Sequence, residues 1–181
     1  LQRVEVSGAV DLAFAPDARH LLVIGGDGAV VEVDVADGRT KTVVRIPVSG
    51  GAHALAIARD GTLAVAADDG LWLWAGAAEP RHVALPALRR VAVAPDGARL
   101  AVAEAGGGWR VLQLADGRTL ARGMGEGDGP LDALAFSHDG RQLATGGARA
   151  RLWDVGTGAA LADWPAPGGV AALDFNRDGD A

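Results

Sequence analysis

The chain has 181 residues and a formal net charge of −6, with 49% hydrophobic and 22% charged residues. Its length fits one domain or a piece of one, and its composition is typical of a globular chain. The negative net charge argues against a nucleic-acid partner. No apolar run reaches the ~18 residues of a membrane span. The lack of Cys excludes disulfides, thiolate metal sites and cysteine nucleophiles. These features leave the compartment undecided, with the cytoplasm favoured.

A short phrase recurs along the chain at a period of about 40 residues. It consists of an apolar run followed by a polar turn that holds an Asp, usually before a Gly. The turn aspartates of the five copies are Asp17, Asp60, Asp96, Asp139 and Asp178, which are separated by 43, 36, 43 and 39 residues. Five copies at this spacing indicate an internal repeat, and a fixed period of this length decides the fold.

Each repeat continues with three further apolar runs. In the first repeat these runs cover residues 21–24, 30–33 and 40–44, and the dipeptide Asp27-Gly28 between the first two is a strong hairpin signal. No window has a sustained helical period. Each repeat therefore predicts four short antiparallel strands joined by tight turns.

Four-stranded units of this kind complete their burial by stacking around an axis, which is the logic of a β-propeller. We expect an all-β fold, with a partial ring of about four four-stranded antiparallel blades and the start of a fifth. The expected boundaries within this single fragment are approximately residues 9–46, 52–85, 88–122 and 131–164 for the blades, 170–181 for the partial fifth blade, and 1–6 for an outer strand of a preceding or closing blade. Because the chain starts at Leu1 and stops just after a turn signal, we expect it to belong to a longer chain.

The repeats resemble those of the WD-repeat propeller proteins. The fourth repeat is the best match, with an apolar run from Leu134 to Phe136, a second run from Leu143 to Gly146, and the sequence Arg151-Leu152-Trp153-Asp154. The equivalents of Trp153 in the first three repeats are Val33, Trp74 and Leu112, so the literal Trp-Asp pair occurs once. The resemblance implies a propeller fold, with about seven blades in a closed ring.

Members of this family often tie each blade with a hydrogen-bonded set of His, Ser/Thr, Asp and Trp. No repeat here shows the complete set. Trp153 has Thr145 but a glycine at the Asp position, Trp74 has Asp68 or Asp69 but no nearby hydroxyl, and no repeat has a His in the loop before its first strand. Such incomplete repeats are similar to those of bacterial members, and we expect cohesion to come mainly from apolar packing.

We predict no catalytic, cofactor-binding or metal-binding residue in this segment, and no enzyme activity. The four His residues have no metal-ligand spacing, and the turn aspartates are expected to bond their own backbone. The alternative is a propeller-based hydrolase or lactonase-type enzyme with site residues in further blades. A cluster of carboxylates or His near the axis would favour that reading, and Asp174 is the one candidate. A third possibility is a purely structural spacer.

Three of the five Trp residues lie outside the third-strand position of Trp74 and Trp153. We expect Trp72, Trp109 and Trp164 to pack between blades. Exposed aromatic side chains would instead mark a partner surface.

WD-repeat proteins usually bind partners on the face where the first strand of each blade begins. The residues at the matching position, four before the Phe, Ile or Val of each first strand, include His53, Arg89 and Asp132. With Arg90, these residues predict a partner-binding rim of mixed charge, against the alternative that they are solvated loop residues. The function expected is a protein–protein interaction scaffold or sensor module with a protein partner, no nucleic acid and no membrane span in this segment.

Overall fold

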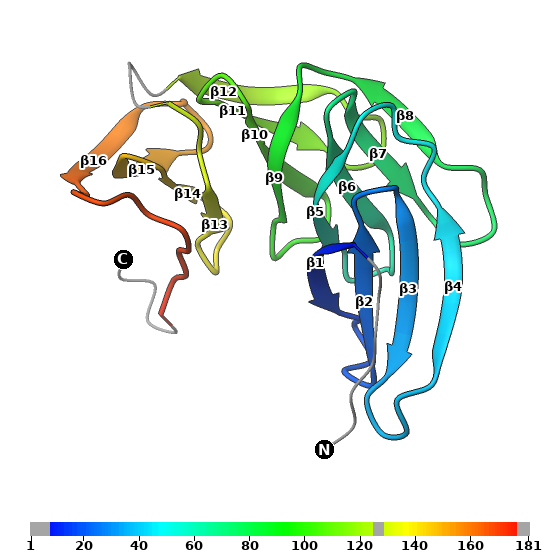
Figure 1. Ribbon diagram of the computed structural model, residues 1–181. Helices are drawn as coiled ribbons and strands as arrows, with labels where there is room; N and C mark the ends of the chain where they lie inside the picture. Colours follow the sequence, from blue (N-terminus) through cyan, green and yellow to red (C-terminus); the bar gives the residue numbers. More distant parts are fainter. Residues whose placement is uncertain (1–7, 125–128, 177–181) are drawn as a thin grey trace. The chain divides into compact units, whose positions relative to one another are not determined.

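The computed structural model describes residues 8–124 and 129–176, and within these ranges it contains strands and no helix (Figure 1). The expected outer strand at residues 1–6 and the end of the partial fifth repeat at 177–181 lie outside the described residues. Consecutive strands form four antiparallel four-stranded sheets, so the all-β class and the four-strand unit are confirmed.

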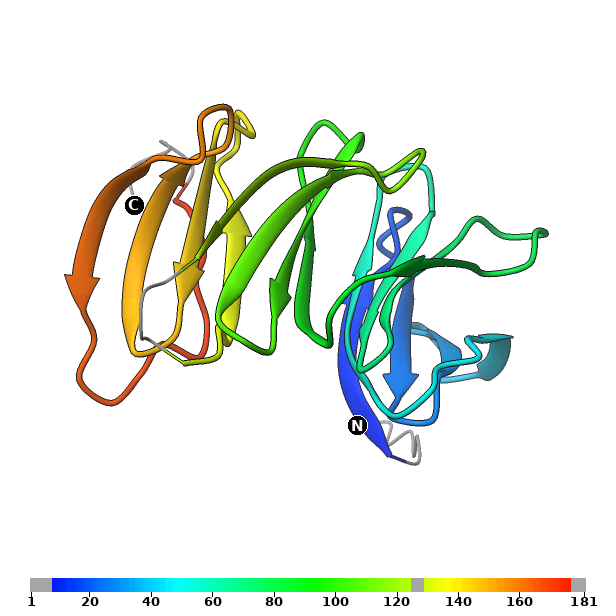
Figure 2. The ribbon, with the colours of Figure 1, turned by 90° about the horizontal axis from the view of Figure 1, so that it is seen from above.

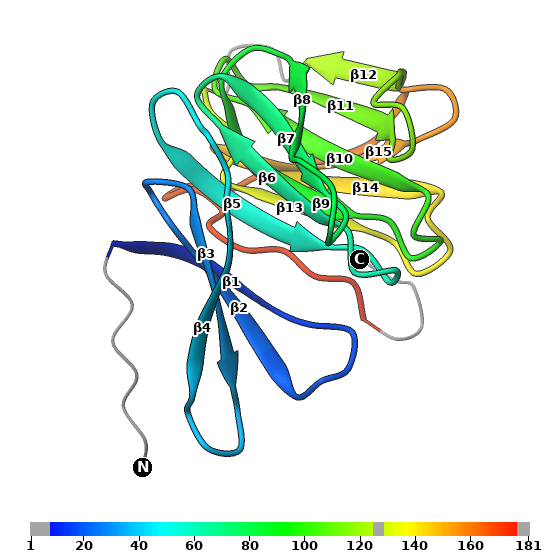
Figure 3. The same cartoon turned by 90° about the vertical axis from the view of Figure 1, so that its right-hand side faces the viewer.

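The strand bounds follow the four repeats in chain order. The first sheet contains β1 (Ala9–Phe14), β2 (His20–Gly25), β3 (Ala29–Asp34) and β4 (Thr40–Arg45). The second, seen with its strands in order in Figure 3, contains β5 (Ala52–Ile57), β6 (Leu63–Ala67), β7 (Gly70–Trp74) and β8 (Arg81–Ala84). The third contains β9 (Leu88–Val93), β10 (Arg99–Glu104), β11 (Gly108–Gln113) and β12 (Thr119–Met124). The fourth contains β13 (Ala133–Phe136), β14 (Gln142–Gly146), β15 (Arg149–Asp154) and β16 (Ala160–Pro165).

The second strand of each sheet is the most deeply buried. All five residues of β6 are buried, and β2, β10 and β14 each bury their last four or central four residues. Their sequences are nearly continuous apolar runs, as expected for strands that are covered on both faces. The fourth strands are largely exposed, since they form the outer edge of each sheet.

Asp side chains close the turns between the first two strands of every sheet. Oδ1 of Asp17 accepts the main-chain N–H of Arg19 at 2.8 Å, and Asp60 holds Thr62 in the same way at 2.9 Å. The equivalent bonds of the third and fourth sheets are made by Asp96 and Asp139, at 2.8 and 2.9 Å. These local bonds confirm the turn role of these four Asp residues, whereas Asp178 lies outside the described residues.

The Asp27-Gly28 hairpin shows why this position needs glycine. Gly28 has φ of 80°, a conformation that L side chains rarely adopt. A Cβ on Gly28 would also collide with the carbonyl oxygen of Ile46. The turn is therefore set by backbone conformation and by a close approach of the chain.

The chain divides into two compact units, with the boundary between Leu88 and Arg89. In the first unit, the first and second sheets share a core that includes Ile24 and Val30 from one sheet and Leu55 and Val65 from the other. In the second unit, the third and fourth sheets share a core built around Trp109, Val111, Leu143 and Trp153. Cohesion within each unit therefore comes mainly from apolar packing between successive sheets.

The segment that opens the fifth repeat lies against the fourth sheet, where it runs back from β16 (Figure 2). Its first bond joins the N–H of Val170 to the carbonyl of Gly147 at 2.8 Å, which repeats the bond from Ala52 to Gly26 at the start of the second sheet. Phe175 is 5% exposed. The segment thus docks with the register of a first strand, although no hydrogen-bonded neighbour makes it a strand within the described residues.

The matching face of the first sheet has no cover among the described residues. Val10, Leu12 and Phe14 alternate along β1 and are 46%, 57% and 62% exposed. Phe14 occupies the position that Phe136 and Phe175 fill in a buried state. We refer to these three side chains as the β1 stripe.

Candidate functional site

Three of the four predicted rim residues lie together in the second unit. Arg89 and Arg90 are in β9, and Asp132 directly precedes β13 of the next sheet. Nε of Arg90 donates to the carbonyl oxygen of Asp132 at 2.7 Å, and Nε of Arg89 lies 3.9 Å from Oδ1 of Asp132. The Arg89 and Asp132 side chains are 46% and 43% exposed, so both charges are open to solvent. We call this pair and Arg90 the Arg89–Asp132 rim.

The two arginines of this rim have different roles. Arg90 is partly buried and binds main-chain oxygens, since its Nη1 also donates to the carbonyl of Arg89 at 3.0 Å. In the first unit, Asp11 holds the equivalent position of β1, and its Oδ2 accepts the N–H of Leu55 in β5 at 2.9 Å. The same register position therefore joins successive first strands in both units, which makes Arg90 a structural tie and leaves Arg89 as the exposed cation.

His53 lies in the first unit, where it makes a contact within its own sheet. Its Nε2 is 2.8 Å from Oδ1 of Asp68, and Oδ2 of Asp68 accepts the N–H of Gly51 at 2.8 Å. Asp68 stands in the turn between β6 and β7. The sequence predicts a rim position for His53 and does not predict its bond to Asp68. The sequence feature that could have predicted this bond is the pairing of β5 with β6, because that pairing brings His53 beside the turn that holds Asp68.

The Trp residues divide into buried and exposed ones. Trp109 is 1% exposed, and its ring centroid lies 5.3 Å from that of Trp153 in the next sheet, which confirms that it packs between sheets. Trp72 packs against the core of the first unit and stacks on His82 of its own sheet at 4.5 Å. Trp164 is 46% exposed on β16, so the expectation that it packs between blades was wrong. As the last strand of its sheet, β16 leaves one edge and much of its surface in solvent.

The polar ties of the Trp residues also differ in part from expectation. Nε1 of Trp153 donates to Oγ1 of Thr145 at 2.9 Å, as the sequence predicted. In the second sheet, it is Trp72 rather than Trp74 that donates to Asp69, at 3.0 Å. The indole N–H of Trp109 has no acceptor among the described residues, although it is buried.

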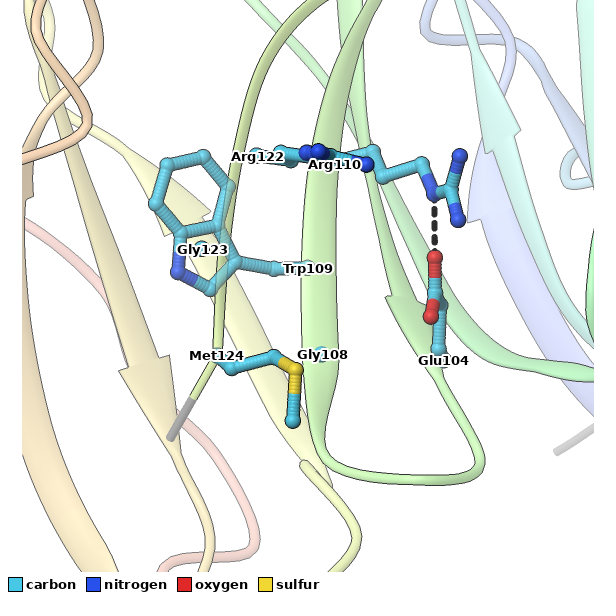
Figure 4. Close-up of a pocket in the computed structure, with 7 residues that line it drawn as sticks. All are labelled: Glu104, Gly108, Trp109, Arg110, Arg122, Gly123 and Met124. Atoms are coloured by element: carbon cyan, nitrogen blue, oxygen red, sulfur yellow. Dashed lines mark hydrogen bonds and ion pairs between the residues drawn. The ribbon is translucent and has the colours of Figure 1, made fainter. Parts of the chain in front are cut away.

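A pocket of about 410 Å³ opens on the outer strands of the third sheet (Figure 4). It is lined by Glu104 from β10, Gly108, Trp109 and Arg110 from β11, and Arg122, Gly123 and Met124 from β12. Arg110 donates to Glu104 through Nε. This pocket lies wholly within the second unit, and it was not predicted from the sequence.

The residues that would support hydrolytic chemistry do not converge on one point within the described ranges. Oδ1 of Asp174 accepts the main-chain N–H of Phe175 at 2.9 Å, which is a local use of the carboxylate. No group of three or more His, Cys, Asp or Glu side chains in the described part of the chain could hold a metal ion. Nothing helical in the described part of the chain is long and apolar enough to cross a membrane.

Comparison with known proteins adds no assignment to this geometry. No protein-family profile matches the chain, and no curated protein is significantly similar to it.

Proposed function

We propose that the four sheets are blades of a WD-repeat-like β-propeller, and that this segment is a protein-interaction scaffold or sensor module of a longer chain. The sequence period, the four-stranded antiparallel sheets and the common docking register of Ala52 and Val170 support this architecture. In a propeller, successive first strands lie side by side near the axis, and the bonds made by Asp11 and Arg90 support such an arrangement within each unit.

The observation that carries the proposal is the exposed charge pair of the Arg89–Asp132 rim. Arg89 and Asp132 come from consecutive sheets, yet Arg90 fixes the backbone between them and their own side chains stay nearly half exposed. At 3.9 Å in solvent, the pair itself contributes little to folding, on the order of 0–1 kcal/mol. Exposed charges that are held beside each other by Arg90, and that contribute little to folding, suit the recognition of a charged protein surface.

Exposed apolar residues on the outer strands support a second contact area. Leu161 and Trp164 on β16 are 51% and 46% exposed. Trp is enriched among the residues that dominate binding energy at protein interfaces. An interaction module with more than one contact surface fits both features.

A propeller-based hydrolase or lactonase-type enzyme is the alternative. It would need a group of carboxylates or His that meet at one point, and Asp174 is the residue from which such a site would be built. The first proposal is preferred because the observed side chains form exposed charge pairs rather than a converging set.

The test is quantitative affinity capture from the source cells with three forms of the protein. These are the unmodified chain, Arg89→Glu, and the control Arg118→Glu, which makes the same charge change at an exposed turn of the third sheet. Charge reversal at a rim changes association rate and salt dependence more than stability. We expect a specific set of proteins to be captured by the unmodified and Arg118→Glu forms and lost with Arg89→Glu. The same captured set with all three forms would refute the rim as the binding site.

A further inference from the structure

The outer strands of the third sheet place two arginines directly opposite each other. Arg110 on β11 pairs with Arg122 on β12, and both line the pocket of Figure 4. Like charges at directly opposed strand positions are destabilising unless another group compensates them. This juxtaposition therefore needs an anion.

The other three sheets hold complementary pairs at the same register position, two residues before the Trp153 position. The first sheet pairs Val31 with Thr42, and the second stacks Trp72 on His82. In the fourth sheet Arg151 faces Asp163, with Nε and Oδ2 3.4 Å apart. The third sheet alone among these four opposes two cations.

The pocket itself supplies one carboxylate for these two guanidinium groups. Glu104 pairs with Arg110, and both side chains are mostly buried, at 18% and 25% exposure. Within residues 8–124 and 129–176, no hydrogen bond or ion pair involves the guanidinium of Arg122. Among the described residues that line the pocket, these three charged groups leave one positive charge in excess.

Trp109 also lines the pocket, but its indole lies on the other face of the sheet from Arg110 and Arg122 (Figure 4). The indole N–H of Trp109 is buried and has no acceptor among the described residues. The indole packs against Gly123 and Trp153, so it takes no part in binding on the arginine side of the pocket. On that side Arg122 is exposed and has no partner among the described residues, so a ligand with acceptor oxygens and a negative charge would pair with its guanidinium.

We propose that this pocket binds the carboxylate of an acidic side chain, Asp or Glu, presented by a peptide segment of a protein partner. One excess positive charge matches a monoanion, whereas a phosphate group would bring about −1.5 to −2. On the same face of the sheet the lining also includes Gly108 and Met124, which suit the apolar stem of an amino-acid side chain. A planar guanidinium binds a carboxylate through paired N–H donors, which gives the site geometric selectivity. The net charge of −6 opposes general attraction of acidic peptides, so binding must come from the pocket.

The test uses two fluorescein-labelled pentapeptides with capped ends, Ala-Leu-Glu-Leu-Ala and Ala-Leu-Gln-Leu-Ala, and fluorescence polarisation with the whole chain. We expect the Glu peptide to bind about tenfold more tightly than the Gln peptide, which corresponds to one charge-assisted hydrogen-bonded pair. Arg122→Gln should remove this difference. The control Arg118→Gln, which removes an exposed charge outside the pocket, should keep it.

Folding of the variant is checked by thermal unfolding. Because Arg122→Gln removes a like-charge opposition, its unfolding midpoint should equal or exceed that of the unmodified chain. Equal binding of the two peptides, or a preference that survives in a folded Arg122→Gln variant, would overturn the proposal. Displacement of the Glu peptide by inorganic phosphate far below the chloride concentration that has the same effect would reassign the pocket to phosphate and also overturn it. None of these outcomes depends on Arg89, so the failure of this site and of the Arg89–Asp132 rim can be told apart.

Discussion

The indole N–H of Trp153 donates to the hydroxyl of Thr145 at 2.9 Å, and both residues are buried, at 7% and 2% exposure. The two side chains come from β15 and β14, which are neighbours in the fourth sheet. The surrounding core is apolar, so this hydrogen bond is a directional contact that fixes how the Trp153 ring lies against β14.

Replacement of Thr145 by Val keeps the shape of the side chain and removes its oxygen. The indole N–H is then left buried without an acceptor, at a cost of about 1–3 kcal/mol in the free energy of unfolding. Denaturant unfolding measures this change, and Thr145→Ser, which keeps the hydroxyl, should retain most of the stability. Equal stability of the Val and Ser variants would show that the bond contributes nothing.

The tie between Arg90 and Asp132 predicts unequal effects for two adjacent arginines. Arg90→Met removes a charged donor from a main-chain oxygen between sheets, and should lower the free energy of unfolding by about 1.5–3 kcal/mol. Arg89→Met breaks an exposed 3.9 Å pair and should change it by less than about 1 kcal/mol. Urea unfolding of both variants checks the order, and a larger loss for Arg89→Met would contradict the assigned roles.

Gly123 lies beneath the Trp109 ring, and this contact predicts a local overpacking effect. A Cβ added at Gly123 would stand 2.6 Å from ring atoms of Trp109, which is held between two sheets. Gly123→Ala should therefore destabilise the protein by about 1–3 kcal/mol. The control is Gly106→Ala, because a Cβ there meets nothing within 4 Å and φ is not positive. Similar unfolding midpoints for the two variants would refute the overpacking argument.

The pairing of His20 with Asp17 predicts a pH-dependent contribution to stability. The bond between Nδ1 of His20 and Oδ2 of Asp17, 2.6 Å long, raises the pKa of the histidine, with further support from the charges of Asp17, Glu32 and Asp34. The N–H of Arg19 and then the His20 ring lower the pKa of Asp17 to about 2.

The raised pKa of His20 and the lowered pKa of Asp17 determine how the stability of the fold depends on pH. A raised folded-state pKa stabilises the fold below the unfolded value of about 6.5, and this contribution is lost as the pH rises through the folded-state pKa. The Asp17 contribution is present above its unfolded value of about 3.9 and is lost as the pH falls toward about 2. Both contributions are thus present between about pH 4 and 6.5.

His20→Gln should lower the midpoint of thermal unfolding more at pH 5.5 than at pH 8.5. Circular dichroism measures both midpoints. The control His138→Gln changes a histidine that is exposed in a turn, and should shift the two midpoints equally. An equal loss at both pH values for His20→Gln would contradict the paired state.

The β1 stripe predicts self-association of the 181-residue chain. Burying the remaining area of Leu12 or Phe14 in a contact would contribute about 1–1.5 kcal/mol each, because full burial of such a side chain is worth about 1.5–3 kcal/mol. Leu12→Thr and Phe14→Thr should each weaken association about tenfold, as measured by sedimentation velocity over a concentration series. Leu120→Thr is the control, because Leu120 is 41% exposed on β12 and belongs to no proposed contact area. A monomer at every concentration, with cooperative unfolding above about 60 °C, would show that the stripe needs no cover.

Features that depend on near neighbours in the chain could be predicted from the sequence. The repeat period, the four-strand unit and the Asp turns follow from periodicity and from bonds between residues two positions apart, such as Asp60 to Thr62. The burial of the second strands follows from their continuous apolar runs. The bond between Trp153 and Thr145 was also within reach, because β14 and β15 form a regular hairpin.

Features that depend on register between strands were decided by the tertiary structure. A bulge between β11 and β12 pairs Val111 with Ala121 but Leu112 with Thr119, and this extra residue is what sets Arg122 opposite Arg110. Without the bulge, counting back from Leu112 and Thr119 would have placed Ala121 there, and a one-residue slip moves every side chain to the other face of a strand. Strand alignment also decides the different environments of two adjacent arginines. Arg90 donates to a carbonyl oxygen of the next sheet, whereas Arg89 is exposed. The sequence by itself thus determined which segments form strands and turns, because those are local interactions, whereas the charges left for a partner were decided by the way distant strands align.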